Sequence, residues 1–246
     1  MKKVGIIGCG AIGTLIATAV EKRIVPCDEL VLYDCNIEKA KALKKSLNFP
    51  ATLVESLEEM IKHKPAIIVE AASQQAAKDY LPRILAAKLE VIVMSVGALL
   101  DMDVESSKIH MPSGAIGGLD AIFSASLAGI EEVVLTSRKN PKALELVTRE
   151  EKLVYEGVAE DAARRFPREM NVAAILALTV KPAKVRVMII ADPKVTRNTH
   201  EIKVRWKHGD MLLKFSNDPH PQNRKTSALA AWSAIGLLKR ILENQS

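Results

Sequence analysis

The stretch Val4-Gly5-Ile6-Ile7-Gly8-Cys9-Gly10-Ala11-Ile12-Gly13 places a short apolar run before three glycines spaced as G-x-G-x-x-G, and a helical pattern follows. In such a strand-turn-helix unit the first glycine permits a tight turn, the second lets a pyrophosphate approach the backbone, and the third allows close packing of helix on strand. Free amides at the helix N-terminus attract phosphate. We therefore predict a pyrophosphate site formed by Gly8, Gly10, Ala11, Ile12 and Gly13.

A second expected strand, residues 29–34, ends in Asp34, near the spacing of a carboxylate that accepts hydrogen bonds from the adenosine ribose hydroxyls. A carboxylate there favours NAD over NADP, because the 2′-phosphate of NADP would meet a like charge and no guanidinium follows. Lys39 softens this preference, so NADP stays possible. Two other interpretations remain open: a glycine-rich turn without a ligand, and an Asp34 that only caps the next helix.

The first hundred residues alternate short β-branched runs with amphipathic stretches, which is typical of βαβ units. We expect strands at 3–8, 29–34, 66–70 and 90–95, and helices at 11–22, 37–47, 56–62 and 74–87. The pattern predicts an α/β fold that begins with a doubly wound parallel Rossmann domain over residues 1–112. Loops after its strands are expected to line the nicotinamide side through Ala72, Ser73, Gln75, Ser95 and Gly97. Helix capping is the alternative role for the residues at 73–75.

After Pro112 the regular alternation of strand and helix patterns ends. We expect a smaller α/β domain over residues 113–246 with a largely antiparallel sheet. A glycine-rich turn at 113–118 opens it. Strands are expected at 132–137, 185–189, 202–206 and 211–215, with residues 208–210 closing a hairpin, and helices at 158–165, 171–180 and 225–242. The last helix has an apolar face that can pack back on the first domain.

Composition narrows the possible partners. The net charge of +6 is spread along the chain and aromatics make up 4%, so a nucleic-acid interface is not expected. No segment has the roughly 18 apolar residues of a membrane span. Residues 1–20 resemble a signal peptide's charged start and apolar core, but four glycines argue against that interpretation. Cys9, Cys27 and Cys35 lack metal-ligand spacing and are odd in number, which indicates no metal site and a reducing cytoplasm.

His200 is the best catalytic candidate among the histidines. It lies at the start of an expected strand and shares parity with Ile202, Val204 and Trp206, so it points to the same side of the sheet. Imidazole titrates near neutrality and can move protons during oxidation of an amine. The alternative is a buried core histidine whose hydrogen bonds are satisfied within the protein.

These features together resemble the L-aspartate dehydrogenases over nearly the whole chain. The segments that carry the resemblance are Glu70-Ala71-Ala72-Ser73-Gln74-Gln75-Ala76, residues 113–121, Arg138-Lys139-Asn140, Phe166-Pro167, Asn171-Val172-Ala173-Ala174 and Asn198-Thr199-His200-Glu201-Ile202. The resemblance implies NAD(P)-dependent oxidation of L-aspartate to iminosuccinate, then oxaloacetate and ammonia, or the reverse reductive amination, serving NAD biosynthesis in a homodimer.

The resemblance also assigns residues. It makes His200 the catalytic residue and places Ala115 and Asn171 against NAD, although Asn171 could instead cap a helix. The substrate is a dicarboxylate, so we look for cations. Lys225, at the expected start of the last helix with Thr226 and Ser227, is the first candidate. Arg138 and Lys139 follow, and Asn198 is assigned to the substrate as well.

One departure puts part of the fold in doubt. Residues 100–111 look short beside the family, so a sixth strand in the first domain is uncertain and the sheet edge beside the nicotinamide could be altered. Two other functions stay open: an imine reductase of the dihydrodipicolinate-reductase type, and a catalytically inactive protein that senses dinucleotides.

Overall fold

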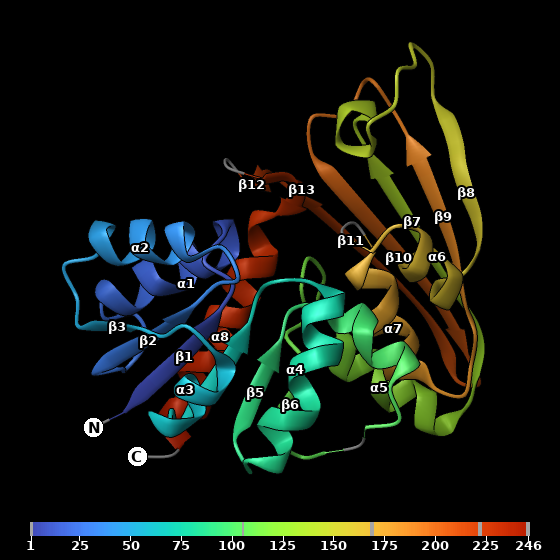
Figure 1. Ribbon diagram of the computed structural model, residues 1–246. Coiled ribbons are helices and arrows are strands. Elements are labelled where there is room, and N and C mark those ends of the chain that lie inside the picture. Colours follow the sequence, from blue (N-terminus) through green and yellow to red (C-terminus); the bar gives the residue numbers. More distant parts are fainter. Residues whose placement is uncertain (1, 105, 168–169, 221–222, 245–246) are drawn as a thin grey trace. The chain divides into compact units, whose positions relative to one another are not determined.

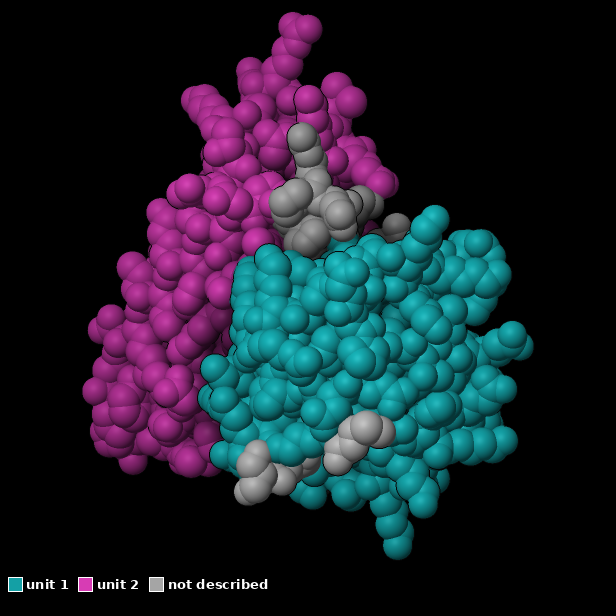
Figure 2. All heavy atoms as spheres, turned by 90° about the vertical axis from the view of Figure 1, so that its left-hand side faces the viewer, with its two compact units in different colours: residues 1–112, 231–246 teal, residues 113–230 magenta. Residues whose placement is uncertain are grey.

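The computed structural model describes residues 2–104, 106–167, 170–220 and 223–244, and the side chains of 220 and 223–226 lie outside the description. The chain divides into two compact units. The first comprises Met1–Pro112 with Ala231–Ser246, and the second comprises Ser113–Ala230. Figure 2 colours the two units separately.

The first unit contains a six-stranded parallel sheet in the order β3-β2-β1-β4-β5-β6, which confirms the predicted Rossmann fold (Figure 1). Its strands are β1 (Lys3–Ile7), β2 (Glu29–Tyr33), β3 (Ala51–Leu53), β4 (Ile67–Glu70), β5 (Glu90–Val93) and β6 (Ile109–His110). Its helices are α1 (Ala11–Glu21), α2 (Ile37–Ser46), α3 (Leu57–Lys62), α4 (Gln74–Ala86), the 3-10 helix η1 (Val96–Asp101) and the part of α8 (Ala228–Asn244) from Ala231 onward. The central strands are buried on both faces, as their unbroken apolar sequences require.

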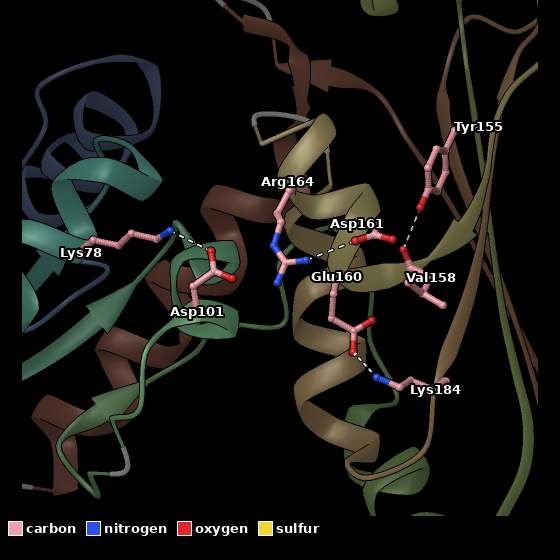
Figure 3. Close-up of polar contacts among 8 residues, drawn as sticks. All are labelled: Lys78, Asp101, Tyr155, Val158, Glu160, Asp161, Arg164 and Lys184. Carbon is pink, nitrogen blue, oxygen red and sulfur yellow. Dashed lines mark hydrogen bonds and ion pairs between the residues drawn. The ribbon is translucent and has the colours of Figure 1, made fainter.

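Two edge strands differ from the expectation. Strand β3 was not predicted, because three half-buried residues give neither a long apolar run nor an alternation. Strand β6 is present and pairs parallel to β5, so the sixth strand exists even though it has only 2 residues. Between β5 and β6 the chain forms η1. The last residue of η1, Asp101, forms an ion pair with Lys78 of α4, and Nζ lies 2.8 Å from Oδ2 (Figure 3).

The second unit contains a five-stranded sheet in the order β11-β10-β7-β9-β8, in which only the β7–β9 pairing is parallel. The predicted, largely antiparallel sheet is therefore confirmed. Its strands are β7 (Ile130–Lys139), β8 (Lys152–Val158), β9 (Val185–Ala191), β10 (Asn198–Trp206) and β11 (Gly209–Asn217). Helices α5 (Leu119–Ala128), α6 (Ala159–Arg165) and α7 (Asn171–Val180) cover one face (Figure 1), and the 3-10 helix η2 (Pro141–Leu144) follows β7.

Strand β8 was missed by the sequence analysis, because its exposed residues outnumber its buried ones. Polar contacts lie on both sides of the junction between β8 and the next helix. The Tyr155 hydroxyl donates to the Val158 carbonyl at 3.0 Å, and Glu160 on α6 pairs with Lys184 at 3.3 Å (Figure 3). The turn between β10 and β11 lies one residue earlier than expected, since Trp206 pairs directly with Gly209.

The predicted start of the last helix was wrong. Helix α8 begins at Ala228, and the preceding residues form β13 (Asn223–Ser227), which pairs with β12 (Pro219–His220). The helical spacing of apolar residues in fact starts at Ala228. The residues before Ala228 are extended because they pair with another strand. Such pairing leaves no helical periodicity in the sequence.

Candidate functional site

The glycine loop joins β1 to α1 with the geometry of a phosphate cradle. Gly8 has φ +96°, and a Cβ there would lie 2.6 Å from the Ala71 carbonyl oxygen. A Cβ on Gly13 would overlap the Gly8 carbonyl oxygen, so this glycine is needed for packing. At Gly10, in contrast, a Cβ would meet nothing within 4 Å. Gly10 is the N-cap of α1 and makes no side-chain cap, so this helix begins without the capping hydrogen bond that its first amides would otherwise donate to an N-cap side chain.

Asp34 follows β2 and holds the loop through backbone amides. Its Oδ2 accepts from the Cys9 amide and its Oδ1 from the Asn36 amide, both at 2.8 Å. The helix-capping alternative is not what the structure shows, because the side chain that caps α2 is that of Asn36. The half-buried Asp34 carboxylate therefore lies directly beside the glycine loop.

The loops after β4 and β5 meet at a buried carboxylate that the sequence analysis did not select. Glu70 is fully buried at the end of β4. Its oxygens accept from the Ala72 amide at 2.9 Å, the Ser73 amide at 3.1 Å, and the Ser95 amide and hydroxyl at 3.0 and 2.9 Å. Burial raises the pKa of this carboxyl, and the four donors oppose that shift. The sequence signal that could have identified this residue is a glutamate at the end of an apolar strand.

Other predicted residues of these loops have local structural roles. The Ser73 hydroxyl caps α4 by accepting from the Ala76 amide at 3.1 Å, as the capping alternative predicted. The exposed Gln75 donates to Asp79 at 2.9 Å along the same helix. Gly97 lies in η1, where a Cβ would collide with the Gln74 side-chain amide. The structure thus brings 72–73 and 95 together through Glu70, while Gln75 points along the helix surface.

In the second unit, His200 belongs to a buried polar cluster on the helix-covered face of the sheet. His200 is 2% exposed, and its Nδ1 shares a hydrogen bond of 2.9 Å with the hydroxyl of fully buried Ser137. Among the residues that the structure describes, Nε2 has no hydrogen-bond partner. Burial, and secondarily the charge of Lys139, lower the pKa of His200 to about 3. The imidazole is therefore neutral at physiological pH.

Two further side chains complete this polar cluster, which consists of Ser137, Lys139, Asn198 and His200. Lys139 is 2% exposed and follows Ser137 on the inner face of β7. Asn198 is 3% exposed and precedes His200 on the inner face of β10. Its Nδ2 is buried and has no hydrogen-bond partner in the described part of the chain.

The glycine-rich turn before α5 packs over the same face. The Asn217 amide donates to the Ala115 carbonyl at 2.9 Å, and Asn217 pairs with Asn198 across β11 and β10. Gly117 lies against the ring of Phe215, which is opposite His200. The structure therefore brings Ala115 to the polar cluster. Asn171 is the first residue of α7 and does not cap it, because the N-cap position belongs to Met170.

The predicted cation site at the start of the last helix is not formed as expected. Lys225, Thr226 and Ser227 lie in β13 and not in α8, and the side chains of the first two are outside the described residues. Ser227 is 4% exposed. Arg138 lies on the outer face of β7, where Glu151 and Asp192 pair with it.

No helix in the described ranges combines the length and the apolar character that a membrane span requires. Likewise, histidines, cysteines and carboxylates form no group of three or more that could hold a metal ion within those ranges.

Comparison with known proteins identifies relatives of both parts of the chain. Residues 8–110 match the family described as the homoserine dehydrogenase NAD-binding domain. Residues 120–241 match the family described as the aspartate dehydrogenase C-terminal domain.

Full-length relatives are similar as well. The L-aspartate dehydrogenase of Methanothermobacter thermautotrophicus is 42% identical over 98% of this chain and 96% of its own length. That of Methanosarcina mazei is 40% identical over 98% and 97%. Among solved structures, the aspartate dehydrogenase of Thermotoga maritima superposes with a TM-score of 0.75 and 26% identity, covering 100% of this chain and 97% of the other.

Proposed function

Because this chain belongs to the L-aspartate dehydrogenase family, we propose that it oxidises L-aspartate with NAD(P) to iminosuccinate, which water converts to oxaloacetate and ammonia, or runs the reverse reductive amination. The observation that carries this proposal is the buried His200, which is neutral and has an available Nε2 beside a lysine and an unpaired amide donor. A neutral imidazole with a ring nitrogen that forms no hydrogen bond within the described residues can accept a proton from a substrate amine.

The cofactor is held by the loops of the first unit in this proposal. The space above Gly10 and the uncapped start of α1 fit a pyrophosphate, and Asp34 beside them fits the ribose hydroxyls. Ala72, Ser73, Ser95 and Gly97 line the continuation of the site, with Ala115 and Asn171 as further cofactor contacts. A nicotinamide dinucleotide held by these residues would supply the acceptor for the hydride from the substrate Cα.

His200 acts as the general base on the substrate amine. In the tautomer whose Nδ1 donates to the Ser137 hydroxyl, Nε2 carries the lone pair. The ammonium of L-aspartate loses one proton to Nε2, and the resulting amine can then release its Cα hydride. The imidazolium later returns that proton to the ammonia that leaves during hydrolysis of iminosuccinate. Ser137 therefore orients the imidazole ring, and His200 moves the proton.

Partners and cellular role complete the proposal. We expect a homodimer, which is supported by the unpaired edge strand β11 and by exposed apolar side chains such as Leu212, at 64%, and Leu127, at 75%. Three free cysteines fit a reducing cytoplasm. A role in supplying iminosuccinate for NAD biosynthesis is compatible with this chemistry.

The deciding experiment is turnover of the purified chain. We expect L-aspartate to drive NADH formation at alkaline pH, with L-asparagine and L-glutamate at least tenfold poorer. Tight NADH binding without turnover would favour the dinucleotide-sensing alternative. Reduction of dihydrodipicolinate in place of aspartate oxidation would favour the other enzyme.

The cofactor assignment has a separate test. Removing the Asp34 carboxylate should reduce the preference for NAD over NADP by roughly tenfold, because the ribose hydroxyls lose their acceptor and the 2′-phosphate its repulsion. Dissociation constants of both dinucleotides for wild type and Asp34→Ala measure this. Lys39→Ala is the companion variant, expected to shift the ratio in the opposite direction. An unchanged ratio in Asp34→Ala would show that the ribose lies elsewhere.

A further inference from the structure

Two tyrosines of the first unit form a pair near the loops where we propose that the cofactor binds. Tyr33 is the last residue of β2, and Tyr80 lies on α4. Their hydroxyl oxygens lie 3.2 Å apart, and their rings form an edge-to-face pair with centroids 6.0 Å apart. Both residues are half-buried. The chain has only 3 tyrosines, so the pairing of two of them at this place calls for an explanation.

The backbone of Tyr33 is fixed to the glycine loop. Its carbonyl oxygen accepts from the Gly8 amide at 2.8 Å, and the next residue is Asp34. The side chain of Tyr33 extends from this point to α4, the helix that follows β4. The hydroxyl pair therefore links the end of β2, beside the glycine loop, to the helix after the neighbouring loop.

Cys35 lies between Asp34 and the tyrosine pair. Its thiol is exposed, and Sγ lies 3.7 Å from Oδ1 of Asp34. The pKa of Tyr80 is raised by its hydrogen bond with Tyr33 and by burial, and Cys35 is close enough to add to this shift. The other carboxylate oxygen of Asp34, Oδ2, accepts from the Cys9 amide of the glycine loop. Asp34 therefore contacts the glycine loop through one oxygen and Cys35, the neighbour of Tyr80, through the other.

The chemistry of a dinucleotide suits this arrangement. Its ribose joins the pyrophosphate to the adenine ring, so an adenine whose ribose lies at Asp34 extends toward residues other than the glycine loop. Adenine has flat faces that stack on aromatic side chains and ring nitrogens that accept hydrogen bonds. Two paired hydroxyls have two hydrogens, and only one of them lies between the oxygens, so the other can be donated to a further acceptor.

We propose that the Tyr80 ring forms one wall of the adenine site, next to Cys35, and that the Tyr33 hydroxyl holds this ring in place. The inference rests on the dinucleotide binding of the proposed function and holds for any substrate. Asp34 and Tyr80 then recognise different parts of one adenosine, the ribose hydroxyls and the base. Tyr33 is a positioning residue, because it acts through Tyr80.

The first test compares Tyr80→Leu with Phe49→Leu. Leucine is apolar but has no flat ring. Phe49 is a half-buried aromatic residue of the same unit that packs under Arg23 just before β3, at the amino end of that strand. We expect Tyr80→Leu to raise the dissociation constants of NADH and of ADP-ribose by similar factors, roughly fivefold to thirtyfold. Reduced nicotinamide mononucleotide lacks the adenosine, so its affinity should not change. Phe49→Leu should bind all three like wild type.

The hydroxyl pair has a test of its own. Tyr33→Phe and Tyr80→Phe each keep the ring and remove the same hydrogen bond. Each should raise the dissociation constant of ADP-ribose about twofold to threefold, and the double variant should bind no more weakly than either single variant. Effects that multiply in the double variant would show that the two hydroxyls act separately, and would overturn the positioning role of Tyr33.

Cys35 reports occupation of the site in the wild-type protein. It is exposed, whereas Cys9 and Cys27 are buried and burial raises the pKa of both thiols, so iodoacetamide should label Cys35 first. We expect ADP-ribose to slow this labelling, because a bound adenosine would cover the thiol. Nicotinamide mononucleotide should not slow it. Peptide mass analysis of the labelled protein identifies the cysteine.

The outcomes separate this inference from the proposed function. Unchanged ADP-ribose affinity in folded Tyr80→Leu would overturn the adenine site, as would an equal loss of affinity for reduced nicotinamide mononucleotide. If circular dichroism shows that Tyr80→Leu does not fold, labelling of wild-type Cys35 decides, and labelling that ADP-ribose does not slow would overturn the site. Protein that binds ADP-ribose as expected but does not oxidise L-aspartate would refute the proposed substrate and support the adenine site. Protein that binds no dinucleotide would refute both.

Discussion

The loops of the first unit, where we propose that the cofactor binds, and the polar cluster of the second unit are formed by different kinds of chemical group. In the loops, the space beside Gly10 is open, no side chain caps α1, and the carboxylates of Asp34 and Glu70 accept hydrogen bonds from loop amides. In the polar cluster, the functional groups are side chains at most 3% exposed, placed on two strands about sixty residues apart in sequence. One site is formed by local chain geometry and the other by sheet register.

The two kinds of site should therefore be sensitive to different substitutions. A backbone site depends on the absence of side chains at given positions, so added atoms should damage it. A side-chain site depends on particular charges and hydrogen bonds in a buried environment, so deleting or neutralising one group should damage it. Four predictions test this contrast.

The largest effect is expected at the side-chain site. His200→Asn keeps a polar group near Ser137 and removes the base, so kcat for aspartate oxidation should fall by roughly 10²–10⁴-fold. The dissociation constant of NADH should stay near wild type, because the cofactor loops are untouched. Steady-state kinetics and NADH fluorescence titration measure both. Activity within fivefold of wild type would remove His200 from the mechanism.

Two glycines of the same loop should respond in opposite ways to alanine. In Gly13→Ala the added Cβ overlaps the Gly8 carbonyl oxygen, so thermal and urea unfolding should show a loss of about 1–3 kcal/mol. In Gly10→Ala the added Cβ meets nothing in the protein, so stability should hold. Cofactor affinity should nevertheless fall roughly tenfold, because the Cβ takes the space of the pyrophosphate. Unimpaired NADH binding by Gly10→Ala would place the phosphates elsewhere.

Burial of His200 also predicts a pH dependence of stability. An unfolded histidine titrates near 6.5, whereas in the folded protein the pKa of His200 is about 3. Between these values the unfolded state binds more protons, so the free energy of unfolding falls as pH falls below 6.5. At pH 5 this loss is about 2 kcal/mol. His200→Asn should lack it, so urea unfolding at pH 7.5 and pH 5 should differ less in the variant. Parallel losses in both proteins would contradict the buried, neutral imidazole.

The smallest effect is expected at Glu70. Glutamine has one acceptor oxygen where the carboxylate has two, so in Glu70→Gln an amide NH₂ must face a donor of Ser95 or of the 72–73 loop. The two loops should loosen, and the dissociation constant of NADH should rise several-fold to about tenfold. The inhibition constant of succinate, an unreactive dicarboxylate, is the internal control and should not change. An unaltered NADH affinity would show that the Glu70 hydrogen bonds do not position the cofactor loops.

Much of the first unit could be read from the sequence because its signals are local. The glycines and Asp34 act over a few residues of strand, turn and helix, and the expected elements there agree with the structure to within one or two residues. The misses have physical causes. Strand β3 is too short for a pattern, β8 is mostly exposed, and residues 225–227 pair as a strand next to a strong helical pattern.

The sequence alone indicated the Rossmann fold, the dinucleotide loop and a catalytic candidate. The spacing of glycines and the alternation of side chains along a strand are properties of the local chain. Only the tertiary structure showed that Ser137 and Lys139 share the buried face with His200, and that Glu70 joins two loops. Sequence cannot supply these relations, since they depend on which residues oppose each other across strands. Burial then sets the charge state of the imidazole, and burial exists only once the sheet and helices have packed.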